Sequence, residues 1–201
     1  EPAIVIFQGQ RSSGPQDRVA DSGSIRFTLQ NGMDTSGGVV GYYSPDHASV
    51  RNRWGLGKVV RVGLESAGVI DYIAQGKIMS IDPVAGNLSN KTVDVVAADW
   101  MDIASRTTMP WIKLGDVENS RDDQVIQVIL DALDDPPDST DFDTGSYTYL
   151  YPLNDLNDGK DTVMTVLQRL AVNGLGRIYI VGNTTSGEVL KYVSKNTLVA
   201  G

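Results

Sequence analysis

The residues of this chain that could perform acid–base or metal chemistry are mostly aspartates. Five lie close together near the middle of the sequence: Asp134, Asp135, Asp138, Asp141 and Asp143. Paired carboxylates can serve as general acid and base, and carboxylate oxygens bind calcium. A calcium loop requires ligands at fixed offsets and a glycine where the backbone turns, and this run has neither. The range Asp134–Thr144 therefore predicts a solvated acidic linker, because like charges repel one another and stay hydrated.

Two further groups of aspartates have spacings that could suit calcium binding or acid–base catalysis. Asp155–Asp161 is closer to an EF-hand loop, but its Gly159 comes one position too early and Val166 stands where the loop needs a glutamate. A turn followed by a helix cap explains it better. Asp99 and Asp102 are three residues apart at a predicted helix start. Capping is their simpler role, and a hydrolase that uses this pair is the least favoured function.

The chain has almost no residues for chemistry that depends on histidine or cysteine. His47 is the single histidine, no G-x-S-x-G motif accompanies it, and we interpret it as a solvated loop residue. The chain has no cysteine, which excludes disulfides, thiol catalysis and cysteine-ligated zinc. Neither Gly55-Leu56-Gly57 nor Gly174-Leu175-Gly176 is followed by the Lys-Ser/Thr of a phosphate-binding loop. The sequence therefore predicts no catalytic residue, no metal ligand and no cofactor, and we expect a protein that is not an enzyme.

Composition narrows the class of protein. The chain has 201 residues, 41% hydrophobic and 21% charged, with a net charge of −8, which is ordinary for a folded protein. The negative charge disfavours nonspecific binding to nucleic acid. No apolar run approaches the ~18 residues of a membrane span. Glu1–Phe7 lacks the pattern of a signal peptide and does not begin with Met, so we expect a segment excised from a longer chain.

The elements that would position functional residues begin with strands. Alternation of apolar and polar residues predicts strands at Ala3–Phe7, Ser24–Gln30, Lys58–Glu65, Val69–Ala74 and Lys77–Asp82. In Lys91–Arg106 the alternation of Val93, Val95 and Ala97 changes to the three-and-four spacing of Trp100, Ile103 and Ala104. This predicts a strand that leads directly into a short amphipathic helix, with Asp94 on the solvent side.

The C-terminal part predicts two helices and a hairpin. One helix covers Gln124–Leu133 and is capped by Ser120–Asp123. The other covers Thr162–Val172, is capped by Asp161, and ends at Asn173-Gly174, which supplies a left-handed residue. Arg177–Val181 and Glu188–Val193 predict the hairpin. The order of elements indicates an α+β fold and not a doubly wound parallel sheet, with a β-rich N-terminal domain at 1–115 and a smaller two-helix and hairpin domain at 116–201.

The range Val39–Gly57 has no period and predicts a long loop. Loops of this length tend to pack on a surface or a partner, and Tyr and Trp are enriched at interfaces. We therefore predict an interface that comprises Tyr42, Tyr43, Pro45, Arg53, Trp54 and Trp111. An alternative is a carbohydrate-binding module of a host-adsorption device, in which Trp54, Trp111 and Tyr147 form a stacking platform for sugars.

An ordered series of segments resembles the tail proteins of phages and prophages. The matching segments are Ser24–Asn31, Tyr43-Ser44-Pro45, Gly57–Val62, Ile73–Ile81, Thr92–Ile103 and Asp161–Val181. The resemblance implies a barrel-like tail-hub fold and a structural module of the hub, baseplate or tail tip that links the tail tube to the adsorption apparatus. It also implies a virion component, assembled in the host cytoplasm.

The resemblance carries expectations about partners as well. We expect self-assembly into a homotrimer, with a hexamer as the alternative, and contacts with tube and tail-tip proteins. The acidic Asp134–Asp143 insertion departs from the common pattern. The chain also stops where relatives continue into further domains, so the resemblance does not extend to receptor binding or to peptidoglycan cleavage.

Overall fold

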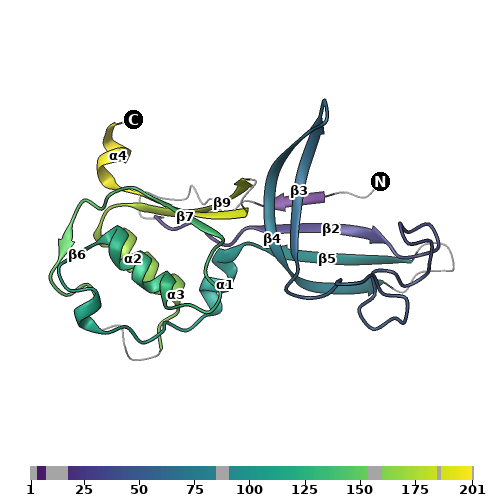
Figure 1. The fold of residues 1–201 in the computed structure, drawn as a ribbon, viewed down its shortest axis with the longest axis horizontal. Coiled ribbons are helices and arrows are strands. Elements are labelled where there is room, and N and C mark those ends of the chain that lie inside the picture. The colour runs from purple at the N-terminus through teal and green to yellow at the C-terminus, as the bar shows by residue number, and fades with distance from the viewer. Residues whose placement is uncertain (1–3, 8–17, 85–90, 154–159, 185–186, 201) are drawn as a thin grey trace. The chain divides into compact units, whose positions relative to one another are not determined.

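A computed structural model describes residues 4–7, 18–84, 91–153, 160–184 and 187–200 (Figure 1). The chain divides into two compact units. The first unit comprises Glu1–Gln8 and Gly23–Asp99, and the second comprises Gly9–Ser22 and Trp100–Gly201. All the described helices belong to the second unit, and the five-stranded sheet of the first unit is wholly antiparallel, so the α+β prediction is confirmed.

The first unit is built on one five-stranded antiparallel sheet. Its strands, in spatial order, are β1 (Ile4–Phe7), β2 (Ser24–Gln30), β5 (Thr92–Ala98), β4 (Val69–Val84) and β3 (Val59–Ser66). The long strand β4 bends along its length, so the sheet curls into a half-barrel (Figure 1). The predicted barrel-like N-terminal sheet is therefore confirmed.

Strand β4 replaces the two separate strands that the sequence predicted at Val69–Ala74 and Lys77–Asp82. The expected break at Gln75-Gly76 is instead part of the strand. Gly76 lies against β5, where an added Cβ would be 2.7 Å from the carbonyl oxygen of Ala98. Register shifts after Val62 and after Ile78 let the sheet curl while its pairing continues.

The predicted alternation of apolar and polar residues in β5 is reflected in which of its side chains are buried. Val93, Val95 and Ala97 are fully buried, whereas Asp94 is exposed and accepts a hydrogen bond from the Thr28 hydroxyl at 2.6 Å. Ile78 packs with Val93 and Val95. One face of β5 is thus turned to the core, as the sequence predicted.

The second unit combines helices with a small sheet. Its helices are α1 (Trp100–Arg106), α2 (Asp122–Asp131), α3 (Val163–Asn173) and α4 (Lys195–Ala200), with a 3₁₀ turn η1 at Leu114–Asp116. Its sheet has the order β7 (Ser139–Phe142), β10 (Gly187–Val193) and β9 (Arg177–Thr184), and β6 (Ser120–Arg121) pairs with β8 (Thr148–Tyr149). The predicted hairpin is confirmed as β9 and β10. Among the described residues, no helix is long and apolar enough to cross a membrane.

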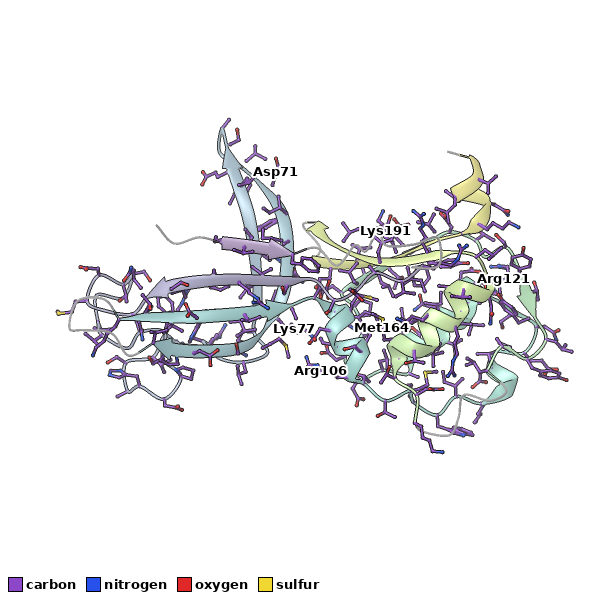
Figure 2. The ribbon with its side chains drawn as sticks, turned by 180° about the vertical axis from the view of Figure 1, so that it is seen from behind. Asp71, Lys77, Arg106, Arg121, Met164 and Lys191 are labelled. Carbon is purple, nitrogen blue, oxygen red and sulfur yellow. The ribbon has the colours of Figure 1, made fainter. Side chains whose placement is uncertain are left out.

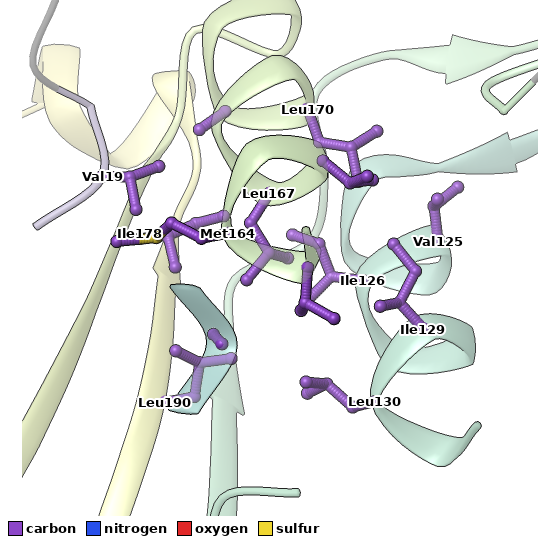
Figure 3. Packing of buried hydrophobic residues seen from close by; sticks show 14 of the residues in the cluster. Val19, Val125, Ile126, Ile129, Leu130, Met164, Leu167, Leu170, Ile178 and Leu190 are labelled. Carbon is purple, nitrogen blue, oxygen red and sulfur yellow. The ribbon is translucent and has the colours of Figure 1, made fainter. Parts of the chain in front are cut away.

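The core of the second unit lies between the helices and the β9–β10 hairpin. Ile126 and Ile129 of α2 point toward Leu167 of α3, and Leu190 of β10 belongs to the same fully buried cluster (Figure 3). Val19 lies beside Ile178, and the two form an isolated parallel bridge. The buried apolar residues of both helices therefore face this core.

The units divide between Asp99 and Trp100, whereas the sequence placed the boundary after residue 115. The boundary lies before α1 because this helix packs in the core of the second unit. Trp100, Met101 and Ala104 are buried in the second core, and the Trp100 indole nitrogen donates to the Asp135 carbonyl oxygen at 2.9 Å. The turn from β5 to α1 is thus the point at which the chain passes from one core to the other.

Three predicted helix ends are wrong in detail. Arg121, not Ser120, precedes α2, and its backbone N–H donates to the Gln124 side-chain oxygen at 3.0 Å. Thr162, not Asp161, caps α3, while Asp161 forms an ion pair with Arg169 at 2.6 Å. Gly174 has a φ of −78°, and Leu175 adopts the left-handed conformation instead, with a φ of 53°.

The acidic segment Asp134–Thr144 is not the solvated linker that its charge predicted. It contains β7, which pairs in parallel with β10. The carboxylates of Asp138 and Asp143 accept hydrogen bonds from the backbone N–H groups of Glu188 (2.9 Å) and Ser194 (3.0 Å). Two of the carboxylates in this segment therefore help to hold it beside β10.

Candidate interaction surface

The buried side chain of Asn31 joins the long loop of the first unit to the end of β2. Asn31 is buried; its side-chain oxygen accepts from the Tyr43 N–H at 2.9 Å and its amide donates to the Ser44 hydroxyl at 2.7 Å. Its backbone bonds to Lys91 and to Gly41. This role had no sign in the sequence, because the hydrogen bonds of a single asparagine to residues a dozen positions away leave no local pattern.

Three aromatic rings pack together inside this loop. Tyr43 contacts Tyr42 and Trp54 edge to face, with ring centroids 5.1 and 5.2 Å apart. The Trp54 indole nitrogen donates to the Tyr43 carbonyl oxygen at 2.9 Å. Tyr43 is buried, whereas Tyr42 and Trp54 are half-buried. The rings therefore fix the loop as well as forming its surface.

A groove of about 480 Å³ opens beside this aromatic group. Its apolar lining comes from Phe27, Leu29, Tyr43, Trp54, Val59, Val60 and Ile78, and its polar lining comes from Arg51, Asn52, Arg53 and Lys58. Arg51, Arg53 and Lys58 are exposed, and none of them forms an ion pair with a described residue. Arg53 also has a left-handed backbone, with a φ of 64°. This cationic groove, as we call it, contains no acidic side chain in its lining.

The predicted interface residues fall into both units. Tyr42, Tyr43, Pro45, Arg53 and Trp54 belong to the loop of the first unit, and Pro45 is exposed there. Trp111 belongs to the second unit, where it is 70% exposed. Five of the six predicted residues therefore lie in one loop, and three of these, Tyr43, Arg53 and Trp54, line the cationic groove. The cations Arg51 and Lys58 were missed, because only the folded loop places them along one groove.

The sugar platform suggested by the sequence also divides between the units, since Trp54 is in the first and Tyr147 in the second. The Lys195 ammonium lies 5.7 Å from the centre of the Tyr147 ring and bonds its hydroxyl at 3.1 Å. One face of that ring is therefore occupied by a neighbouring cation.

The residues considered for catalysis have structural partners. The Asp99 carboxylate accepts from the Gly23 N–H at 2.7 Å, and Asp102 forms an ion pair with Arg106 on the surface of α1 (Figure 2). His47 is exposed, as predicted, and accepts from the Ser49 N–H at 3.1 Å. Within the described ranges no three Asp, Glu or His side chains are grouped as metal ligands. Most of the EF-hand-like segment, 154–159, lies outside the described residues.

A buried polar group organises the second unit. Asp122 begins α2, is fully buried, and accepts a hydrogen bond from the Tyr192 hydroxyl at 2.8 Å. Burial, together with this bond, raises the pKa of Tyr192 above its ordinary value, and burial next to the same carboxylate raises the pKa of Tyr149. Both phenols therefore stay protonated at neutral pH, and the group joins α2 to β10.

The neighbouring carboxylate behaves differently. Burial acts to raise the pKa of Asp123, but hydrogen bonds from Arg121 and from the Gly145 N–H outweigh it and lower that pKa. Arg121 stands immediately before α2, at the place labelled in Figure 2. Asp123 is thus an ionised anchor for the start of the helix.

Comparisons with known proteins yield fold relatives only. No family model and no curated protein matches the sequence. Among solved structures, the 43 kDa tail protein of prophage MuSo2 from Shewanella oneidensis matches with a TM-score of 0.56 and 12% identity, over 94% of this chain and 49% of that one. A tail protein from Neisseria meningitidis matches with a TM-score of 0.51 and 13% identity, over 94% of this chain and 51% of that one.

A third structure of similar fold comes from a secretion system. It is an E. coli component of the type VI secretion system, described as similar in structure to the T4 bacteriophage tail proteins gp27 and gp5. It matches with a TM-score of 0.52 and 15% identity, over 85% of this chain and 41% of that one. The chain thus spans about half the length of the structures that it matches. The chain has a fold found in phage and prophage tail proteins and in a related secretion-system component.

Proposed function

We propose that the chain is a structural, self-assembling module of a phage or prophage tail hub or tail tip, which links the tail tube to the adsorption apparatus. The observation that carries the proposal is the shared fold, which extends over 94% of the chain in two tail proteins. One fold relative is a secretion-system component described as similar in structure to gp27 and gp5. This likeness favours a place in the tail hub over other places in the tail.

The surface of the first unit supports a role in assembly. Strand β1 is one edge of the half-barrel, and its Ile4, Val5 and Phe7 side chains are all more than half exposed. At the tip of the β3–β4 hairpin, Leu64 and Val69 are also more than half exposed. An edge strand without charges or proline is open to pairing with another chain. Such surfaces suit a protein that works through its contacts.

We infer a role without catalysis, because the solved relatives are tail and secretion-machine components. The partners we propose are further copies of the chain, as a homotrimer with a hexamer as the alternative, together with tube and tail-tip proteins. The proposal places the protein in the virion, after assembly in the host cytoplasm.

The proposal is tested by measuring the mass of the full-length protein in solution by light scattering, over a range of concentrations, and its binding to the tail-tube protein of the same phage or prophage. We expect a closed oligomer and retention of the tube protein. A strict monomer that also fails to bind the tube protein would overturn the proposal.

Glycan binding is a second candidate, and the exposure of Trp111 favours it. An indole that is 70% exposed can stack on a sugar ring. Titration with cell-wall glycans should then change the tryptophan fluorescence of the wild type but not of a Trp111→Ala variant. An unchanged spectrum across a broad panel of glycans would remove this candidate.

A further inference from the structure

The negative charge of the protein is concentrated in one of its two units. The first unit contains seven Lys and Arg and eight Asp and Glu, for a net charge of −1. The second contains ten Lys and Arg and 17 Asp and Glu, for a net charge of −7. The cationic groove therefore belongs to the nearly neutral unit, and almost the whole net charge belongs to the other.

The cationic groove has the chemistry to bind an acidic peptide. Its lining is apolar, so it can take up aliphatic or proline side chains. Arg51, Arg53 and Lys58 are exposed and form no ion pair with a described residue, so they are available to carboxylates. The lining has no acidic group to repel an anion or to orient a sugar hydroxyl. Both features favour an acidic peptide over a neutral glycan.

The second unit carries a segment of matching composition. No Lys or Arg occurs between Arg121 and Lys160. Within this stretch Asp131–Pro136 combines exposed carboxylates at Asp131 and Asp134 with the apolar residues Leu133 and Pro136. A carboxylate and a proline thus lie within a few residues of one another, which is the pattern that the groove can bind.

The position of this acidic segment adds a second reason. Asp131 is the last residue of α2, and no basic residue occupies the last turn of that helix. The C-terminal end of a helix carries partial negative charge, so carboxylates there are unfavourable unless cations approach. A guanidinium or ammonium group from a partner would relieve this repulsion.

We propose that the cationic groove of one copy binds the Asp131–Pro136 segment of a second copy. This inference rests on the proposed self-assembly and names the surfaces that would mediate it. The second copy is the occupant that charge complementarity within this chain favours, because each copy carries both halves of the contact. Such a contact is heterologous, so repeated copies close into a ring when the rotation allows it.

The decisive experiment reverses charge on each side of the contact. Variant Arg51→Glu/Lys58→Glu changes the groove, and variant Asp131→Lys/Asp134→Lys changes the segment. We expect each to weaken association of the full-length protein at least tenfold, and we expect the chain that carries all four changes to associate again. The control Arg26→Glu/Lys113→Glu has the same net charge as the groove variant, changes exposed residues outside the groove, and should associate like the wild type.

The outcomes separate this inference from the proposed function. A wild type that is monomeric at every concentration contradicts self-assembly itself. Oligomers that persist unchanged in both reversal variants contradict the groove contact alone. If the two reversal variants dissociate but the variant with all four changes does not associate again, the groove and the acidic segment do not contact each other directly, and the inference is overturned.

A binding assay keeps the test valid if a variant fails to fold. A synthetic peptide of residues 129–138 should alter the fluorescence of Trp54, which lines the groove, in the wild-type protein. A peptide with lysine at positions 131 and 134 is the matched control and should have no effect. Equal responses to the two peptides would contradict the proposal.

Discussion

The hydroxyl of Tyr192 donates a hydrogen bond of 2.8 Å to the carboxylate of Asp122, and both side chains are sealed from solvent. The pair connects the first residue of α2 to the last part of β10. The other carboxylate oxygen of Asp122 has no hydrogen-bond partner among the residues that the structure describes. A buried carboxylate requires hydrogen bonds, so the stability of the second unit depends on the Tyr192 hydroxyl.

Replacement of that hydroxyl tests this dependence. We expect Tyr192→Phe to lower the free energy of unfolding by about 1–3 kcal/mol, the cost of leaving a buried polar group without its hydrogen bond. Urea denaturation followed by circular dichroism measures the change. The control is Tyr151→Phe, which alters an exposed tyrosine and should change stability by less than about 0.5 kcal/mol. Equal effects of the two changes would contradict the assigned role of the bond.

The same group predicts a loss of stability in alkaline solution. Tyrosines of the unfolded chain lose their protons near about pH 10, whereas burial and Asp122 raise the pKa of Tyr192 and Tyr149 in the folded protein. The folded state then holds more protons than the unfolded state, so the free energy of unfolding falls as the pH rises above about 10 and is unaffected below it. Urea denaturation between about pH 8 and 11 measures the slope. A double variant, Tyr149→Phe/Tyr192→Phe, should show a shallower slope, and an unchanged slope would contradict this account.

Gly174 is required for space rather than for an unusual backbone angle. An added Cβ would lie 2.5 Å from the Asp122 carboxylate. We therefore expect Gly174→Ala to destabilise the protein by about 1–3 kcal/mol, a typical cost of overpacking a core. Thermal unfolding measures it, with Gly115→Ala as the control, because a Cβ at Gly115 would have no atom within 4 Å. A tolerated Gly174→Ala would show that the Asp122 side chain can move aside.

Asn31 should determine the order of the long loop without being part of its surface. Asn31→Ala removes the side-chain bonds to Tyr43 and Ser44. We expect faster proteolysis within the loop, a changed Trp54 fluorescence spectrum and a stability loss of about 1–3 kcal/mol. Asn52→Ala, at an exposed position of the same loop, is the control and should leave all three nearly unchanged. If both variants are cut at the same rate, Asn31 does not hold the loop.

Local patterns in the sequence predicted most elements, because the information lies within the elements themselves. Strand β2 has its predicted bounds. The junction of β5 and α1 was predicted from the change, within a few residues, from alternating to helical spacing of apolar residues. The continuity of β4 was not predictable, since Gln75-Gly76 looks like a turn until Val60 and Arg61 of β3 pair with it. Strand β7 was missed for the same reason, because its partner β10 lies about 50 residues further along the chain.

The candidate surface was predictable in part. Aromatic residues in an aperiodic loop pointed to Tyr42, Tyr43 and Trp54, which the structure groups together. The burial of Tyr43 and the hydrogen bonds by which Asn31 holds the loop join residues that are not neighbours in the sequence. The local pattern therefore did not predict them. The cationic groove depends on where Arg51 and Lys58 lie after folding, which no local pattern indicates.

The bridge between Val19 and Ile178 has a consequence for how the protein is made. Arg18 donates to the Leu175 carbonyl oxygen across 157 residues, and the Ala20 and Ile178 backbones are also joined. The sequence of the first unit, Gly23–Asp99, lies between these two partners in the chain. The segment around Val19 can therefore pair with Ile178 only after all the residues between them have been synthesised. Because this pairing closes a very long loop, we expect it to form more slowly than the half-barrel.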